Sequence, residues 1–265
     1  TKAPAPTHYF GAGDSLRFGI LPDLFVKASY EYAIRIPEPV ELFGNGSQIS
    51  ANAALLPESS HNANLGVSLN GHEIPSGSLS FDAGYFVRRT KNLIFLSVAL
   101  DSAQYQNISD VDTTGVEGGL TWKGWNTLTL SANGTILHSV SQSTGGWFGR
   151  FKGDRIPNLP YLFGNLGASL SLPWIQQVLP KTRVYWHGHY VHKYFLFWES
   201  EGDPNHKLRI PGHFLQTCGV STTLASGRVT AGLEVQNLTD SKNYDNVGQQ
   251  LSGRSWHFKT TIVLD

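Results

Sequence analysis

The sequence contains no methionine and only one cysteine, Cys218, among its 265 residues. A single cysteine cannot form an intrachain disulfide, so a disulfide scaffold is excluded, and so is a cysteine-based zinc finger. Because position 1 is threonine, we expect the chain to be a processed product or a part of a longer one.

Charge and long apolar runs are also scarce. Charged residues make up 15% of the chain, against about 25% in typical soluble domains. The formal net charge is +0, so the chain has no basic excess and no nucleic-acid partner is expected. The longest apolar runs, Leu93–Leu96 and Tyr194–Trp198, fall far short of the roughly 18–20 residues that a transmembrane helix needs.

The sequence is instead rich in glycine, with 28 residues, and in aromatic residues, at 12%. This mixture favours strands and turns over helices. Apolar and polar residues alternate with a period of two through most of the chain: between Leu24 and Pro37, Val26 and Tyr30 alternate with Lys27 and Glu31. Because successive side chains of a strand point to opposite faces, this segment predicts a two-faced strand.

The same alternation predicts about eleven strands, at 15–21, 24–36, 61–70, 79–88, 113–123, 125–137, 161–173, 181–193, 213–224, 228–237 and 254–264. A soluble sandwich would alternate in the same way. A membrane barrel is favoured because the segments reach the length of a tilted span and because short and long connections alternate. The long connections are expected at about 38–60, 89–112, 138–160, 194–212 and 238–253. The predicted fold class is therefore all-β, an antiparallel transmembrane β-barrel.

An odd number of strands makes the first and the last strand run in the same direction. If the turn at 225–227 is periplasmic, residues 1–14 are expected on the extracellular side. Single helical turns are expected at 37–43 and 174–178.

Several segments resemble the C-terminal half of TonB-dependent outer-membrane receptors. Residues 28–37 and 41–44 are similar to a mid-barrel strand that ends in Arg-x-Pro and is followed by Glu-Leu-Phe/Tyr-Gly. Residues 52–58 resemble Asn-Pro-x-Leu-x-Pro-Glu, with Ala53 in place of the first proline, and 235–254 resemble the closing Asn-Leu-Thr-Asp…Tyr…Gly-Arg pattern. The motifs occur in family order over about 14–264, although the chain ends on Asp265 and not on the usual Phe or Trp. The motif residues to which we assign structural roles are Arg35, Pro37, Glu41, Pro57, Glu58, Gly115, Glu117, Asn237, Asp240, Gly253 and Arg254.

The resemblance implies a 22-stranded barrel with a plug inside it, and about eleven strands are half of that. Residues 1–265 are thus expected to be the C-terminal part of such a barrel, with the plug domain absent from this chain. Unpaired backbone groups at the two open edges would each cost several kcal/mol in hydrocarbon. The expected inner face carries charges that suit a wet lumen or a plug: Lys27, Glu31, Arg35, Asp82, Arg88, Glu117 and Glu234. Expected partners are outer-membrane lipid, a second polypeptide with the N-terminal half barrel and plug, and TonB, reached through that polypeptide.

Two groups of residues are candidates for binding. Trp147, Phe148, Arg150, Phe151 and Lys152 combine aromatic rings, which stack on sugars and flat chelates, with cations that attract anions; packing is an equally open role for them. His187 and His189 share a strand face and are either a metal-ligand pair or, as we favour, lumen-facing polar residues. No metal site and no cofactor is expected.

No catalytic constellation occurs at a telling spacing, so an enzyme is not expected. The predicted function is import of a scarce ligand (siderophore, cobalamin, glycan or peptide) across the bacterial outer membrane. The alternatives are a structural or secretion-associated barrel component and a passive porin-like channel. A partner with a plug and a TonB box would favour the first of the three.

Overall fold

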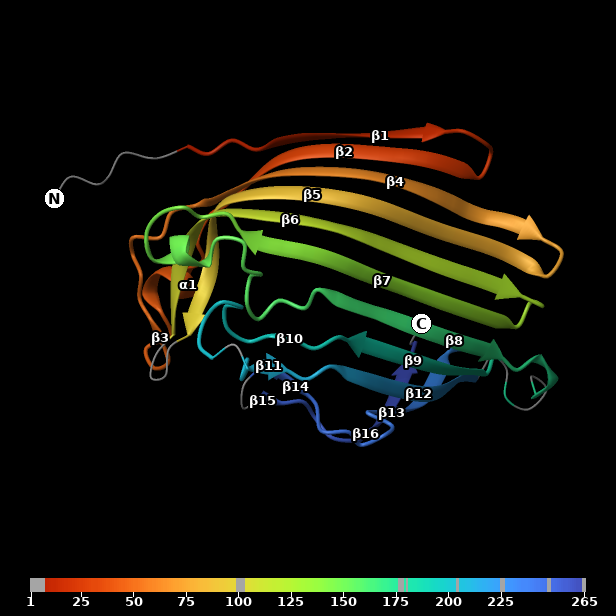
Figure 1. Ribbon diagram of the computed structural model, residues 1–265. Helices are drawn as coiled ribbons and strands as arrows, with labels where there is room; N and C mark the ends of the chain where they lie inside the picture. The colour runs from red at the N-terminus through yellow and green to blue at the C-terminus, as the bar shows by residue number, and fades with distance from the viewer. Residues whose placement is uncertain are drawn as a thin grey trace.

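The computed structural model describes residues 8–98, 103–175, 179, 181–203, 205–224, 227–246 and 249–263. Eleven antiparallel strands follow one another in chain order across one sheet (Figure 1). They are β1 (Ala12–Gly19), β2 (Leu24–Arg35), β4 (Glu58–Ile74), β5 (Gly77–Val98), β6 (Ala103–Gly124), β7 (Leu128–Ser141), β8 (Leu162–Ser171), β9 (Arg183–Val191), β12 (His213–Leu224), β13 (Val229–Gln236) and β16 (Ser255–Ile262). The expected all-β fold with eleven antiparallel strands is confirmed.

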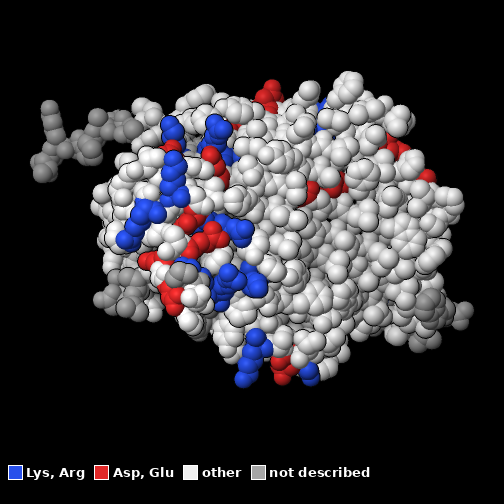
Figure 2. Space-filling model, viewed as in Figure 1, with Lys and Arg blue, Asp and Glu red and all other residues white. Residues whose placement is uncertain are grey.

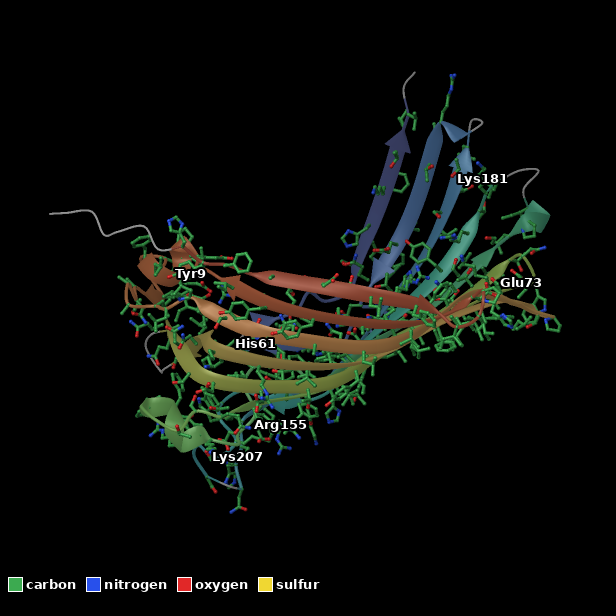
Figure 3. The ribbon with its side chains drawn as sticks, turned by 90° about the horizontal axis from the view of Figure 1, so that it is seen from above. Tyr9, His61, Glu73, Arg155, Lys181 and Lys207 are labelled. Carbon is green, nitrogen blue, oxygen red and sulfur yellow. The ribbon has the colours of Figure 1, made fainter. Side chains whose placement is uncertain are left out.

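The sheet is curved into a trough that stays open along one side (Figure 3). β1 forms one edge and β16 the other, and within the described residues neither pairs with a second neighbour. The molecule is therefore part of a barrel wall and not a closed barrel.

The connections at the two ends of the sheet differ in size (Figure 1). One end, called the loop end here, carries the small elements α1 (Pro39–Phe43), β3 (Ile49–Ser50), η1 (Trp147–Phe151), β10 (Tyr194–Phe195), β11 (Arg209–Ile210), β14 (Tyr244–Asn246) and β15 (Gln249–Gln250). The other end, called the turn end, carries the shorter connections, among them the short 3-10 helix η2 (Pro173–Ile175). The helical turn expected at 37–43 is present as α1; of the turn expected at 174–178, residues 176–178 lie outside the described residues. Residues 8–11 lie at the loop end, and residues 1–7 are outside the described part.

The expected long loop at 89–112 is wrong. β5 and β6 stay paired from Gly77↔Gly124 to Val98↔Ala103, so their arms extend well beyond the neighbouring strands. Asn92 adopts a left-handed backbone with φ of 54° and interrupts the side-chain alternation. Ladder hydrogen bonds involve only the backbone and continue across such a break, which is why alternation alone ended the strand too early.

Two hairpin turns differ from expectation, the first being tighter and the second longer. β4 and β5 pair to Ile74↔Gly77, so only two residues connect them, and a bulge between Leu69 and His72 absorbs the extra length. The strand expected at 125–137 begins at Leu128, because Trp125 and Asn126 have φ of 50° and 57°. Consecutive left-handed residues match the twist of a tight hairpin turn and cannot continue a strand.

One face of the sheet is a continuous apolar surface. The register joins Leu16, Ala28, Leu65, Tyr85 and Val116 in one row across five strands. Leu16 is 67% and Leu65 59% exposed, whereas charged side chains gather mainly at the loop end (Figure 2). An apolar surface of this extent requires an apolar surrounding, and on a sheet of long strands it is the lipid-facing belt of a membrane barrel. None of the helices in the described part is long and apolar enough to cross a membrane.

The opposite, inner face is polar. Lys27 shares a row with Glu117, and Glu31 shares a row with Arg88; together with Asp82 these side chains are exposed. None of these five takes part in an ion pair within the described residues. The inner face thus has charges without counter-charges, as expected for a wall that meets water or another polypeptide.

Introducing an arginine at either of two neighbouring positions of β4, one on each face, tests the assignment of the two faces. Leu65→Arg should destabilise the barrel by about 2–4 kcal/mol because it places a charge at the lipid face. Asn64→Arg, which places the same charge on the inner face, should cost much less. Unfolding by urea in lipid bilayers measures both, and equal losses would contradict the assignment.

Candidate functional site

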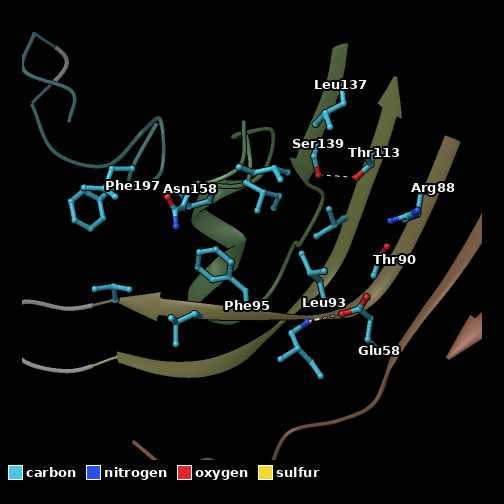
Figure 4. A pocket seen from close by; sticks show the side chains of 18 of the residues that line it. Glu58, Arg88, Thr90, Leu93, Phe95, Thr113, Leu137, Ser139, Asn158 and Phe197 are labelled. Carbon is cyan, nitrogen blue, oxygen red and sulfur yellow. Dashed lines mark hydrogen bonds between the residues drawn. The ribbon is translucent and has the colours of Figure 1, made fainter. Parts of the chain in front are cut away.

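A cavity of about 1100 Å³ lies at the loop end, against the inner wall of the sheet (Figure 4). We call it the vestibule cavity. Inner-face residues of β5, β6 and β7, including Arg88, Thr113 and Ser139, form one wall, and the segments 156–159 and 196–197 form another. Its size is that of a small-molecule site.

The extended arm of β5 supplies much of the apolar lining. Leu93 and Phe95 follow the left-handed Asn92 and line the cavity. Figure 1 shows β5 bending at the loop end. The bend places part of the apolar run Leu93–Leu96 in the wall of the cavity.

A charged network fixes the base of the β5 arm. At the end of β2, Arg35 Nη1 donates to Glu41 Oε1 at 3.0 Å, and Arg35 Nη2 donates to Glu58 Oε2 at 3.4 Å. Glu58 Oε2 also accepts from the backbone N–H of Ile94 at 3.1 Å, and Glu41 Oε2 accepts from the N–H of Glu38 at 2.7 Å. Three of the family-motif residues thereby join β2, α1, β4 and β5.

Asparagine side chains attach the segment before β4 to the same arm. Asn107 Nδ2 donates to the carbonyl oxygens of Leu56 and Asn92, at 3.0 and 2.8 Å, and its Oδ1 accepts from the Leu56 N–H at 2.8 Å. Asn52 Nδ2 donates to the Tyr105 carbonyl oxygen at 2.8 Å. Amide side chains suit this role because each offers a donor and an acceptor to the backbone.

An aromatic cluster joins the loops that surround the cavity. Trp198 stacks on Phe151 with ring centroids 4.6 Å apart and an interplanar angle of 6°. It also meets Phe148 and Phe95, at 5.9 and 6.0 Å between centroids, and Ile108 completes the buried core. The cluster fixes the loop after β7 and the loop after β9 against the β5–β6 arm.

A second contact joins the loop between β9 and β12 to the loop between β13 and β16. The Tyr194 hydroxyl donates to the Asp245 carbonyl oxygen at 2.7 Å. Burial, and secondarily the charge of Asp245, raises the pKa of Tyr194, so the phenol stays protonated and keeps its donor role.

The predicted ligand-contact residues of the loop after β7 are divided between two environments. Phe148 and Phe151 are 7% and 3% exposed and belong to the aromatic cluster, which is the packing role that was the alternative for them. Trp147 is exposed, with the Arg150 guanidinium 3.2 Å from its ring centroid, and Lys152 is exposed. These residues do not belong to the lining of the vestibule cavity.

The motif residues near the C-terminal end of the chain form a turn. Asn237 Nδ2 donates to the carbonyl oxygens of Ser241 and Ser252 at 2.9 and 3.1 Å. Asp240 Oδ1 accepts from the Arg254 N–H at 2.8 Å, and a Cβ on Gly253 would lie 3.2 Å from that same oxygen.

The remaining motif residues lie along the sheet. A Cβ on Gly115 would lie 2.7 Å from the carbonyl oxygen of Ile136 and 2.4 Å from Phe86 Cζ, so a larger residue there would clash with the backbone of β7. Glu117 is exposed on the inner face, and Pro37 and Pro57 flank the segment that carries α1 and β3.

The two histidines share the inner face of β9 without forming a metal cluster. His189 Nδ1 lies 2.8 Å from Asn165 Oδ1, and His187 contacts the ring of Tyr185, with centroids 5.4 Å apart. Within the described residues, groups of three or more His, Cys, Asp or Glu side chains arranged to hold a metal ion were not found.

The sequence had not pointed to the vestibule cavity. Of its lining, Arg88 and Glu58 are singled out in the sequence, but as a lumen charge and a motif residue, and no ligand-binding role is expected for Phe95, Phe197 or Asn158. These residues meet only because segments far apart in the chain converge, and the alternation of side chains does not predict that convergence.

Comparison with known proteins identifies the fold. The family model described as TonB dependent receptor-like, beta-barrel matches residues 6–238. The chain belongs to this family. The receptor family is one of transporters and not of enzymes, and the barrel resides in the bacterial outer membrane. A search of curated proteins found no match.

Solved structures share the fold of this receptor barrel at low sequence identity. The copper transporter OprC aligns with a TM-score of 0.70 and 17% identity, over 94% of this chain and 38% of its own. A mutant of the ferric enterobactin receptor PfeA from Pseudomonas aeruginosa aligns with 0.69 and 16%, over 95% and 40%. The siderophore receptor PirA from Acinetobacter baumannii gives 0.67 and 13%, over 95% and 40%. This chain therefore spans about 40% of the length of the receptors that it resembles.

Replacing Arg35 tests the charged network. Arg35→Met should leave the carboxylate of Glu41, which is only 8% exposed, without its cation, at a cost of about 1–3 kcal/mol. Faster amide hydrogen exchange in 38–57 would report the loss. Arg89→Met is the control: its pair with Asp112 spans 3.9 Å at an exposed site and should contribute about 0–1 kcal/mol. Equal effects of the two changes would argue against a structural role for Arg35.

Replacing Trp198 tests the aromatic cluster. Trp198→Ala removes the ring that stacks on Phe151 and should cost about 3–5 kcal/mol locally, with new protease cleavage in 142–154 and 196–208. Trp147→Ala, at a side chain that is 60% exposed, should leave both segments resistant. Unchanged protection in the Trp198 variant would show that the loops are held by other contacts.

Proposed function

We propose that this chain is half of a 22-stranded receptor barrel that imports a scarce ligand across the outer membrane. The other strands and the plug come from polypeptide outside these residues, which we take to be a second chain. The ligand is one of the classes considered above: a siderophore, cobalamin, a glycan or a peptide. TonB acts on the assembly through the part that carries the plug.

The direction of the two edge strands carries this proposal. β1 pairs antiparallel with β2, β13 pairs antiparallel with β16, and every pairing between them in the sheet order is antiparallel. β1 and β16 therefore both run from the loop end to the turn end. Closure of β1 on β16 would produce a parallel pair, and so would insertion of a second copy of this chain in the same membrane orientation.

Barrels of this kind in bacterial outer membranes are antiparallel throughout and have an even number of strands. The missing part must then contribute an odd number of strands, with both of its terminal strands running from the turn end to the loop end. Because each unpaired backbone group costs several kcal/mol in hydrocarbon, the two edges of this chain require such a partner in the membrane.

The charges of the inner face support the proposal that a plug lies inside the barrel. Lys27, Glu31, Asp82, Arg88 and Glu117 are exposed and have no ion-pair partner within the described residues. A polar domain inside the barrel would supply counter-charges or ordered water to both the acidic and the basic side chains. The names of the similar structures fit import of a scarce solute, since they include a copper transporter, a ferric enterobactin receptor and an iron transporter.

Cysteine crosslinking in outer membranes tests the closure. With Cys218→Ser as background, Ser15→Cys combined with Ser29→Cys should crosslink, because these residues face each other across β1 and β2. Ser15→Cys combined with His257→Cys, which joins β1 to β16, should give no crosslink within the chain or between copies. A crosslink in the second pair would refute the proposed partner.

The isolated complex tests transport. It should contain strands and a plug from a second polypeptide, seen on a denaturing gel, and immobilised periplasmic domain of TonB should retain it. A complex without a plug, not retained by TonB, would support a passive channel or a structural barrel component and contradict active import.

A further inference from the structure

The vestibule cavity has a polar row at one side, and away from this row apolar side chains predominate in what we call the apolar end (Figure 4). Arg88, Thr113 and Ser139 lie at one side of the view, whereas Phe95 lies toward its middle and Phe197 at the far side, next to Asn158. The three polar residues form a single row across β5, β6 and β7, because Arg88 pairs in register with Thr113 and Thr113 with Ser139. We call them the donor row.

Arg88 is an uncommitted cation. Its side chain is exposed, and it takes part in neither an ion pair nor a side-chain hydrogen bond within the described residues. Glu31 stands two strands away in the same row, with Asn62 on the strand between them. A guanidinium offers up to five N–H donors in a planar fork that matches a carboxylate or another oxyanion.

The two hydroxyls beside it retain a donor. Thr113 Oγ1 and Ser139 Oγ lie 2.7 Å apart and share one hydrogen bond. Each hydroxyl carries one proton and only one of the two is used between them. The second proton is left to donate toward the cavity, so the donor row combines a cation with a neutral donor.

Arg88 is the cation of the lining, and the other two charged residues there, Glu58 and Glu201, are acidic. Glu58 accepts from Arg35 and from the Ile94 N–H. Glu201 takes part in no ion pair among the described residues, and Lys207 donates only to its backbone carbonyl oxygen, at 2.8 Å. Arg88 is therefore the group of the lining that can attract an anion.

The apolar end excludes ligands that are polar throughout. Leu93 and Phe95 come from the β5 arm and Phe197 from the loop after β9, and Phe197 is 37% exposed. Rings and aliphatic chains bury well against such walls. Asn158 and Glu201 are the polar residues among the loop segments of the lining, so a glycan would recover few of the hydrogen bonds that it loses to water, and a polyanionic chelate would in addition meet the Glu201 carboxylate.

We propose that the vestibule cavity binds an amphipathic small molecule with a single anionic group. The anion is held by the donor row of Arg88, Thr113 and Ser139, and an aromatic or aliphatic body lies against Leu93, Phe95 and Phe197. This proposal rests on the proposed function, for which it names the chemical class of the ligand.

Two probes with the same ring system separate the two ends of the cavity. They are 8-anilinonaphthalene-1-sulfonate, which carries one anion, and N-phenyl-1-naphthylamine, which carries none. Fluorescence titration is carried out on the complete complex, as isolated from outer membranes and placed in lipid nanodiscs, with empty nanodiscs subtracted. The sulfonate should bind more tightly than the neutral amine.

Variants then assign the contacts. Arg88→Gln should weaken binding of the sulfonate about tenfold or more, as expected for loss of a hydrogen bond to a charged group, and change the amine less than twofold. Phe197→Ala should weaken both probes. Lys27→Gln is the matched control, since Lys27 is another exposed inner-face cation and does not line this cavity; it should change neither probe.

Three results would overturn the proposal: no preference for the sulfonate, equal losses of both probes in Arg88→Gln, or an equal effect of Lys27→Gln on the sulfonate. The second result, together with loss of the plug-bearing chain from the complex, would assign Arg88 to contact with the plug. The assay uses neither TonB nor uptake. A complex that shows the expected pattern but is not retained by TonB would refute import while supporting the ligand class.

Discussion

Every strand of this sheet carries backbone N–H and C=O groups that hydrocarbon cannot satisfy, and the structure follows from the need to pair them. Between β1 and β16 the ladder is continuous in chain order, so each inner strand is paired on both sides. The backbone groups on the outer edges of β1 and β16 have no such partner within the described residues. Because both edge strands run in the same direction, the chain cannot complete the ladder by itself in an antiparallel way.

The two faces of the sheet divide the chemistry. The apolar row through Leu65 and Tyr85 meets lipid, and the row through Lys27 and Glu117 lies on the other side of the same backbone. A period of two permits this division within every strand. The uncompensated inner charges are tolerable only where water or another protein domain meets them, which is why the wall and the contents of the barrel must be considered together.

At the loop end the organisation changes from regular pairing to side-chain contacts. Arg35, Glu41 and Glu58 connect four elements, and Trp198 gathers the surrounding loops into one packed cluster. These contacts hold open a cavity whose lining comes from distant parts of the sequence. The regular sheet provides the rigid wall on which that less regular region is built.

The sequence by itself determined the strands, their two faces and the family, because alternation and turn residues act over a few neighbouring positions. The alternation around Val26 and Lys27, for instance, already separates lipid face from inner face, and the motif at Arg35 and Glu41 marks the end of its strand. The sequence did not reveal the paired arms beyond Asn92, since backbone hydrogen bonds continue where side-chain alternation fails.

Only the tertiary structure decided that Phe148 and Phe151 are packed inside, and that Arg88, Thr113 and Ser139 form one row beside Phe95 and Phe197. The physical reason is that the sequence did not show where the hairpin turns lie, and these turns set which residues of β5, β6 and β7 share a row. The loop residues Phe151 and Phe197 reach the aromatic cluster and the cavity from other parts of the chain, and no local pattern encodes that convergence.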